Sequence, residues 1–403
     1  MPLFTCTKCS KELPLDGEEQ RCPVCNEPLE VRYESMPKTD WNRFPLEKSA
    51  LLRYAEVLPF KTYHDSLSLA EGGTPLVAAE QLGAQLGIRS LYLKNEGLNP
   101  TGSFKDRGTA CALQHVAAVD KRVIGTVSTG NMAASVAAYA AKAGLDCFVL
   151  VKESTSDEKL AEIRAYGPTV VRVDGDYGEL YFRSLELGKR LGIYFVNSDN
   201  PFRVEGQKTI AFEIVQQLLP ALPDVIVVPV SSGGNISAII KGLEEMVTMR
   251  LIDRVPRLVA VQAEGCSPIA RAYNAGGKTV GHFGRVDTVA HAISNPSPPS
   301  GDRVLQKLRL HDGTMVTVKD DEIIQAQREL ARYAGILGQP ASAAPIAAVK
   351  KLIADGSLDS DQTVVAVVTG HGLKDPGALK RLVQTTSETV PLDGLDTFIR
   401  EYM

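Results

Sequence analysis

Short apolar runs rich in β-branched residues recur along this chain, and stretches with helical spacing separate them. The runs predict buried strands at residues 91–94, 123–127, 147–151, 169–173, 193–196, 225–230, 258–262 and 364–368. The stretches between them predict helices at residues 106–119, 133–142, 157–166, 178–191, 203–219, 236–246 and 343–353. Strands that alternate with helices and are apolar on both faces indicate mainly parallel sheets with right-handed crossovers.

These elements are too numerous for one compact sheet. The chain has 403 residues, whereas a single hydrophobic core stops growing at about 250–300 residues. We therefore predict an α/β fold with two parallel-sheet subdomains and a cleft between them.

Composition and charge exclude several classes of protein. With 44% hydrophobic and 23% charged residues, the chain is neither disordered nor collagen-like nor a coiled coil. The 44 Lys and Arg against 48 Asp and Glu provide no electrostatic footprint for nucleic acid or an anionic membrane. The apolar runs are far shorter than the ~18–20 residues of a membrane span, and the first residues lack a basic-then-apolar signal. We expect a cytoplasmic protein that binds neither nucleic acid nor membrane.

The N-terminus carries a metal-ligand pattern. Four of the seven cysteines form two C-x2-C pairs twelve residues apart, Cys6 with Cys9 and Cys22 with Cys25. Each pair can turn two thiolates toward one tetrahedral Zn²⁺, and four thiolates close its coordination shell. We predict a structural zinc ribbon at residues 1–35. Two disulfides are the alternative, which the lack of a secretion signal disfavours.

Lys105 lies where the strand at residues 91–94 leads through a Gly- and Pro-containing loop into the next helix. The positive end of the helix dipole disfavours an ammonium there, which lowers the pKa of Lys105 and favours the neutral amine. A neutral amine is the form that makes an imine. An exposed lysine that merely begins a helix is the alternative.

A glycine-rich turn follows the strand at residues 225–230. It consists of Ser231, Ser232, Gly233, Gly234 and Asn235. Paired glycines let main-chain N–H groups converge on an anion at a helix start, and the serines add hydroxyl donors. Because the Walker lysine and the dinucleotide glycine pattern are both missing, a single phosphate monoester fits better than a nucleotide. Simple helix capping is the alternative.

Two further strand ends carry polar residues. Ser128 and Thr129 follow the strand at residues 123–127, where a helix start suits a carboxylate. Thr369 offers a hydroxyl after the strand at residues 364–368, at the strand end where ligands bind in open α/β folds. A lysine for an imine, a cradle for one phosphate and a carboxylate pocket together suggest pyridoxal phosphate acting on an amino acid.

Several segments resemble the threonine synthases and, more broadly, the fold-type II pyridoxal-phosphate lyases. These segments are residues 55–59, 69–75, 99–108, 197–209 and 369–376. The resemblance covers nearly the whole chain, and an N-terminal zinc ribbon occurs in some relatives. It implies that residues 36–403 form a pyridoxal-phosphate-dependent catalytic region, with about residues 115–200 as its smaller mobile subdomain. It also implies a homodimer.

The resemblance implies a role for each candidate residue. Lys105 holds the cofactor as a Schiff base and then moves protons between Cα, Cβ and Cγ of the substrate. The cofactor and the substrate carboxylate are bound by the remaining strand-end residues: Asn131 at the 3-oxygen, Thr369 at the pyridine nitrogen, Ser232, Gly233, Gly234 and Asn235 at the phosphate, and Ser128 and Thr129 at the carboxylate.

The substrate phosphate site implied by the resemblance consists of Asn200, Arg203, Gln207 and Lys208. Arginine gives a planar fork and lysine a point charge, and both suit a leaving phosphate dianion. In that family O-phospho-L-homoserine loses phosphate by γ-elimination, and water then adds at Cβ to give threonine. A solvated helix face is the alternative for the two cations.

Three places depart from the family pattern. Met132 stands where relatives usually show Thr, Gln339 where they usually show Glu, and residues 294–301 replace a different segment. We expect all three around the distal end of the substrate, where substrate choice is made. Such a change suits a shorter substrate, O-phosphoserine, with β-replacement as in cysteate synthase. A deaminating lyase and a zinc-ribbon binding module on an inactive scaffold are further alternatives.

Overall fold

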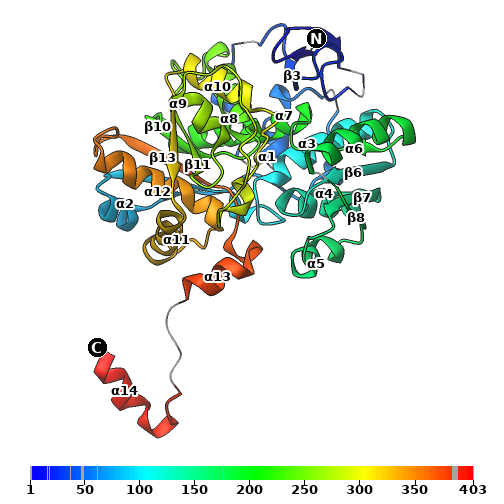
Figure 1. Ribbon diagram of the computed structural model, residues 1–403. Coiled ribbons are helices and arrows are strands. Elements are labelled where there is room, and N and C mark those ends of the chain that lie inside the picture. Colours follow the sequence, from blue (N-terminus) through cyan, green and yellow to red (C-terminus); the bar gives the residue numbers. More distant parts are fainter. Residues whose placement is uncertain are drawn as a thin grey trace.

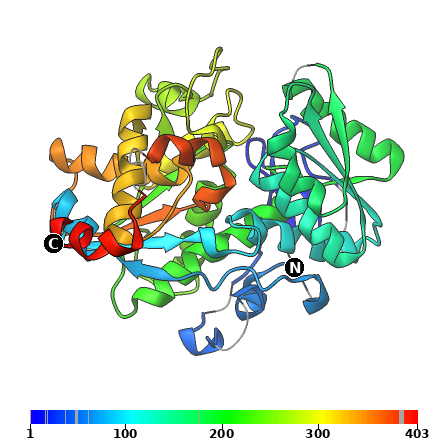
Figure 2. The ribbon, with the colours of Figure 1, turned by 90° about the horizontal axis from the view of Figure 1, so that it is seen from below.

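The computed structural model describes residues 2–15, 17, 19–36, 38–46, 50–60, 62–175, 177–383 and 389–402. Two α/β units lie side by side, with a small N-terminal β-sheet against them (Figures 1 and 2). The prediction of an α/β fold with two parallel sheets is therefore confirmed. In the described parts of the chain, no helix combines the length and the apolar character that a membrane crossing requires.

The larger unit contains a six-stranded sheet. Its strands, in spatial order, are β12 (Thr314–Val318), β11 (Arg257–Ala263), β10 (Val225–Pro229), β13 (Thr363–Val368), β5 (Ser90–Asn95) and β4 (Leu76–Ala78). All neighbours are parallel except β4 and β5. Every residue of β10 is buried, because helices cover both faces of the sheet and the valine-rich sequence provides apolar side chains for both.

The smaller unit contains a four-stranded parallel sheet. Its strands are β8 (Thr169–Val173), β7 (Asp146–Lys152), β6 (Val123–Val127) and β9 (Tyr194–Phe195), and its helices are α4 (Asn131–Ala143), α5 (Asp157–Ala165) and α6 (Tyr177–Leu191). The alanine-rich face of α4 allows close packing on the sheet. Met132 is buried in the same apolar cluster as these alanines.

Three helices of the larger unit pack with their main chains in contact. They are α3 (Lys105–Ala118), α7 (Pro201–Leu218) and α8 (Gly234–Thr248). A Cβ added to Gly206 of α7 would lie 2.0 Å from the carbonyl oxygen of Arg107 in α3. One added to Gly242 of α8 would lie 2.7 Å from the carbonyl oxygen of Lys208 in α7. Only glycine permits both approaches.

The remaining helices surround these elements. They are α1 (Ala50–Arg53), α2 (Glu80–Leu86), α9 (Pro268–Asn274), α10 (Gly301–Leu310), α11 (Asp320–Ala334), α12 (Pro340–Ala354), α13 (Pro376–Leu382) and α14 (Leu395–Tyr402). Figure 1 shows α14 standing away from both units at the C-terminus.

The N-terminal ribbon is an antiparallel sheet in the order β2 (Glu12–Pro14), β1 (Leu3–Cys6) and β3 (Leu29–Arg32). It packs on the start of α7, where the rings of Phe4 and Phe202 meet edge to face at 5.6 Å. This buried aromatic contact joins the ribbon to the larger unit.

Candidate active site

The candidate residues gather at the carboxyl ends of parallel strands. The loop that precedes Lys105 pairs with the segment that follows β13. The Phe104 amide donates to the carbonyl of Thr369 at 3.1 Å, and the His371 amide donates to the carbonyl of Gly102 at 2.8 Å. These bonds bring Lys105, the first residue of α3, next to Thr369.

The amine of Lys105 is strongly perturbed. Removal from water, and to a smaller extent the positive charge of Arg203, together lower the pKa of Lys105 to about 7. The sequence predicted a lowered pKa from the helix start, whereas burial is the largest cause in the structure. A pKa near 7 keeps a large fraction of the amine neutral and nucleophilic at physiological pH.

Arg203 supplies a buried cation with free donors. Its Nη1 donates to Thr109 Oγ1 at 2.8 Å, whereas Nε and Nη2 are buried without a hydrogen-bond partner in the described part of the protein. Burial lowers the pKa of Arg203 to about 10, and the carboxylate of Asp106 opposes that change. Unpaired donors of a buried guanidinium are costly, so this arrangement fits an anion that binds beside Lys105.

The glycine turn leads into α8 and presents hydrogen-bond donors at the N-terminus of that helix. Gly233 has a φ of 93°, a left-handed conformation that favours glycine, and the first turn of α8 contains no acidic residue. Both polar atoms of the Asn235 side chain are buried without a partner among the described residues. Main-chain N–H groups, the helix dipole and this amide fit a phosphate group.

Gln207 connects the lysine helix with the glycine turn. If Gly108 of α3 carried a Cβ, that atom would lie 2.8 Å from Gln207 Nε2. A Cβ added to Gly234 would lie 4.0 Å from Gln207 Oε1. The buried Oε1 has no hydrogen-bond partner within the described residues. Gln207 thus lies between the helix that Lys105 begins and the glycine turn, an arrangement compatible with a shared site.

Residues 294–301 lie against this turn. Asn295 Nδ2 donates to Ser232 Oγ at 2.9 Å, and the Ser300 amide donates to the carbonyl of Ser232 at 3.0 Å. The sequence led us to expect this loop at the distal end of the substrate. The structure shows that this loop contacts the glycine turn through the side chain of Asn295 and the main-chain amide of Ser300. Its place relative to the substrate stays a prediction.

The smaller unit reaches the same region through Asn131, the first residue of α4. Its Nδ2 donates to Gln339 Oε1 at 3.2 Å, and the Gln339 amide donates to the carbonyl of Gly370 at 3.1 Å. Gln339 thus lies between Asn131 and the segment after β13. Ser128 lies in the preceding loop, where its Oγ accepts the amide of Gly130 at 3.3 Å. Thr129, between them, is partly buried.

One partner in this region was missed by the sequence analysis. Ser342 Oγ lies 3.1 Å from Thr369 Oγ1 and accepts the amide of Gly370 at 2.8 Å. It therefore fixes the hydroxyl of Thr369. No local pattern could have indicated this contact, since the two residues belong to separate elements.

Two predicted substrate residues have other partners. Asn200 caps α7, since its Oδ1 accepts the amide of Phe202 at 3.0 Å and its Nδ2 donates to the Tyr194 hydroxyl at 3.1 Å. The ammonium of Lys208 lies in a buried network, 2.6 Å from Glu205 and 2.7 Å from Glu245. The structure thus brings together Lys105, Arg203 and Gln207 but gives Asn200 and Lys208 contacts of their own.

The four N-terminal cysteines form a compact cluster. Their Sγ atoms all lie within 4.8 Å of one another, and Cys6 and Cys25 approach to 3.4 Å while Cys9 and Cys22 approach to 3.6 Å. A tetrahedron with Zn–S of ~2.3 Å separates sulfurs by about 3.8 Å. The amide of Val24 points at Cys22 Sγ at 3.4 Å. This cluster is compatible with the predicted structural zinc.

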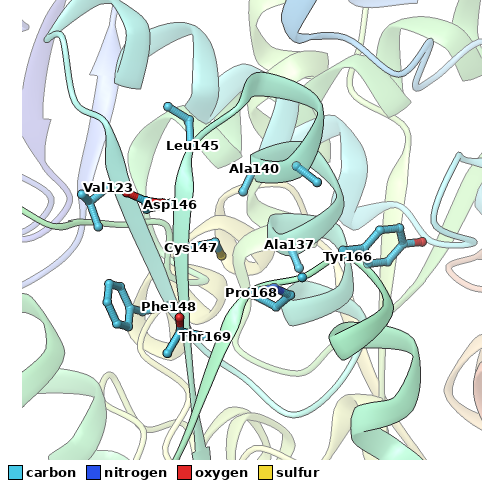
Figure 3. A pocket seen from close by; sticks show the side chains of 12 residues that line it. Val123, Ala137, Ala140, Leu145, Asp146, Cys147, Phe148, Tyr166, Pro168 and Thr169 are labelled. Carbon is cyan, nitrogen blue, oxygen red and sulfur yellow. The ribbon is translucent and has the colours of Figure 1, made fainter.

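A hollow of about 410 Å³ lies elsewhere, on the smaller unit (Figure 3). Figure 3 shows it between α4 and the strands β6 and β7, with the side chains of Ala137, Cys147 and Tyr166 at its walls. None of the candidate catalytic, cofactor or substrate residues lines it. It is separate from the site formed by Lys105 and the glycine turn.

Comparison with known proteins agrees with this geometry. The model of the family described as "Pyridoxal-phosphate dependent enzyme" matches residues 67–370, so the chain belongs to that family. The fold is similar to that of the processed threonine deaminase isoform 2 from Solanum lycopersicum, with a TM-score of 0.66 and 22% identity over 77% of this chain and 87% of that one. The predictions of fold type II, of pyridoxal phosphate and of an enzyme are therefore confirmed.

Within the family, the chain groups with the threonine synthases. It is 42% identical to the threonine synthase of Methanocaldococcus jannaschii over 383 residues, which are 94% of each chain. It is 37% identical to the threonine synthase of Methanosarcina acetivorans over 398 residues, which are 98% of this chain and 97% of that one. The predicted resemblance to this group is confirmed.

Proposed function

We propose that this protein converts O-phospho-L-homoserine and water to L-threonine and phosphate. One observation carries the proposal: the buried guanidinium of Arg203 presents unpaired Nε and Nη2 donors beside the amine of Lys105, which has a pKa of about 7. An amino acid that bears a phosphate places a dianion near the reacting carbons, and a fixed guanidinium fork suits that group. The two relatives described above are named threonine synthases.

Bound pyridoxal phosphate supplies an electron sink for carbanions at the substrate. In our assignment Lys105 would hold the cofactor, and its Nζ would then take one proton each from substrate Cα and Cβ. Phosphate leaves as the Cγ–O bond breaks, Nζ returns one proton to Cγ, water adds its hydroxyl at Cβ, and Nζ returns the second proton to Cα, while the remaining proton of the water goes to the released phosphate. The low pKa suits this exchange, because the amine can gain and lose a proton near neutral pH.

The other contacts follow from position. The amides of the glycine turn, with Ser232, Gly233, Gly234 and Asn235, bind the cofactor phosphate. Asn131 donates to the 3-oxygen, and Gln339 holds its amide in place. Thr369, fixed by Ser342, faces the pyridine nitrogen.

The substrate is bound at two ends. Ser128 and Thr129, at the start of α4, bind its carboxylate. Arg203 binds its phosphate through Nε and Nη2, donors that have no partner among the described residues. We assign Gln207 to the same end, where its Nε2 would be the donor. Asn200 and Lys208 support this end through the cap of α7 and the ion-pair network. We also propose a homodimer in the cytoplasm, which light scattering and fractionation test.

O-phosphoserine gains no support from the three departures. Met132 is buried in the core of the smaller unit, Gln339 accepts a hydrogen bond from Asn131, and the loop at residues 294–301 contacts the glycine turn. A product assay offers O-phosphohomoserine and O-phosphoserine separately, each with water or with sulfite. We expect threonine and phosphate from O-phosphohomoserine with water alone. Cysteate from O-phosphoserine and sulfite, with no threonine, would overturn the proposal.

A further inference from the structure

A buried carboxylate lies between the ribbon and the site. Asp199 belongs to the loop before α7, and its side chain is 2% exposed. Arg21 of the ribbon forms an ion pair with Asp199 Oδ2, and the hydroxyl of Tyr181 in α6 donates to Oδ1. A buried carboxylate depends on such partners, because removing its counter-charge leaves an uncompensated charge in a medium of low dielectric.

The neighbours of Asp199 contact the site directly. The carbonyl oxygen of Ser198 lies 3.2 Å from the position of a Cβ on Gly234 in the phosphate-binding turn. Asn200 caps α7, and the amide of Arg203 donates to its carbonyl at 3.0 Å. A displacement of Asp199 therefore moves both the glycine turn and the guanidinium of Arg203.

The position of Arg21 is set by the metal knuckle. Arg21 immediately precedes Cys22, and its Nε donates to the carbonyl of Asn26 at 2.7 Å. Its guanidinium lies 5.5 Å from the ring centre of Phe182 and 6.0 Å from that of Tyr181. The ribbon thus contacts α6 of the smaller unit and the start of α7 through one side chain.

We propose that Arg21 is a positioning residue for the phosphate end of the active site. The cysteine knuckle fixes the position of Arg21. Arg21 and Tyr181 in turn bind the carboxylate of Asp199, and this fixes the loop that contains Ser198 and leads to Arg203. The proposal rests on the proposed function, which assigns the substrate phosphate to Arg203. If Arg21 has this role, the ribbon contributes to substrate binding as well as to the stability of the fold.

Arg21→Met tests the proposal in the cofactor-loaded full-length enzyme. Arg32→Met is the matched control, since Arg32 is a ribbon arginine that is 63% exposed and pairs with Glu12 at 3.0 Å. We expect Arg21→Met to raise the KM for O-phosphohomoserine and the inhibition constant of inorganic phosphate by about tenfold, with kcat changed less than about threefold. Arg21→Lys restores part of this loss, and Arg32→Met has no effect.

Hydrogen exchange provides a readout that does not depend on turnover. In Arg21→Met, the amides of residues 198–200, 202 and 203 (residue 201 is a proline) are expected to exchange about tenfold faster than in the parent enzyme. The visible absorbance of the bound cofactor and the zinc content stay unchanged. Removal of zinc by a chelator is expected to accelerate exchange in the same residues, because it releases the knuckle that holds Arg21.

If Arg21→Met does not fold, two variants outside the ribbon test the same contact. Asp199→Asn and Tyr181→Phe remove the charge and the hydroxyl on the other side of the contact. The inference would be overturned if these variants and Arg21→Met had the same KM, the same inhibition by phosphate and the same exchange rates as the parent enzyme. If the parent enzyme forms no threonine, the proposed function fails, whereas the exchange experiment still decides whether Arg21 orders the loop.

Discussion

The interaction between Arg203 and Lys105 leads to a quantitative prediction. A lysine at the ordinary pKa of 10.5 is neutral in roughly three molecules in ten thousand at pH 7, whereas a pKa of about 7 makes about half of the Lys105 amines neutral. The second cause of this lowering is the charge of Arg203. Arg203→Gln removes that charge, so the pKa of Lys105 rises and the neutral fraction at pH 7 falls.

The rate at which pyridoxal phosphate attaches to cofactor-free protein measures this directly. The neutral amine reacts, so the rate rises with pH and reaches half of its maximum near pH 7 in the parent protein. In Arg203→Gln the midpoint moves to higher pH, although burial still holds it below 10.5. Arg32→Gln, which removes an exposed arginine, leaves the midpoint unchanged.

Two results would refute this reasoning. A midpoint near pH 10 in the parent protein would show that burial does not perturb Lys105. The same midpoint in the parent and in Arg203→Gln would show that the guanidinium does not act on the amine. Because attachment is measured without substrate, loss of substrate binding in the variant does not affect the comparison.

Three further substitutions test the assigned roles. Lys105→Ala is expected to abolish threonine formation, and borohydride reduction followed by peptide mapping no longer labels the helix that begins at this position. Arg203→Ala raises the KM for phosphorylated substrates and leaves a non-phosphorylated analogue nearly unaffected, as steady-state kinetics measures; equal losses on both would argue against a phosphate pocket. Lys208→Met removes one of the two ammonium groups, Lys208 and Lys241, that pair with Glu205 and Glu245, so the free energy of unfolding falls by up to about 3–5 kcal/mol while KM changes little. Denaturant titration checks this, and a large KM effect in a stable variant would return Lys208 to the substrate site.

The strands were predictable where both faces are buried. Each predicted apolar run corresponds to a strand of one of the two main sheets, and the strands inside these sheets are buried because helices cover both faces. The partly exposed edge strand β8 was predicted too, whereas the two edge strands of the larger sheet were missed. In β12 (Thr314–Val318) Thr317 interrupts the apolar residues, and β4 (Leu76–Ala78) has only three residues, so neither gives a long apolar run.

The candidate site was predictable in its motifs but not in all its contacts. Arg203 and Lys208 look equivalent in sequence, yet five residues rotate a helix by about 500°, which places the two side chains about 140° apart. Arg203 and Gln207 are four residues apart and share a face. Asn200 stands before Pro201 at the start of α7, a pattern that already indicates an N-cap. The pairing of Ser342 with Thr369 depends on the tertiary fold and left no local signal.

The glycine contacts among α3, α7 and α8 define a fixed length. Lys105 begins one outer helix and the glycine turn begins the other, and the middle helix contacts both at Gly206 and Gly242. Main-chain contacts therefore set the distance between the Cα atom of Lys105 and the glycine turn. A methyl group added to either glycine would push two of the helices apart and lengthen that distance. Pyridoxal phosphate, whose length is fixed, would then reach only one of the two groups that we assign to it, the Lys105 amine and the glycine turn.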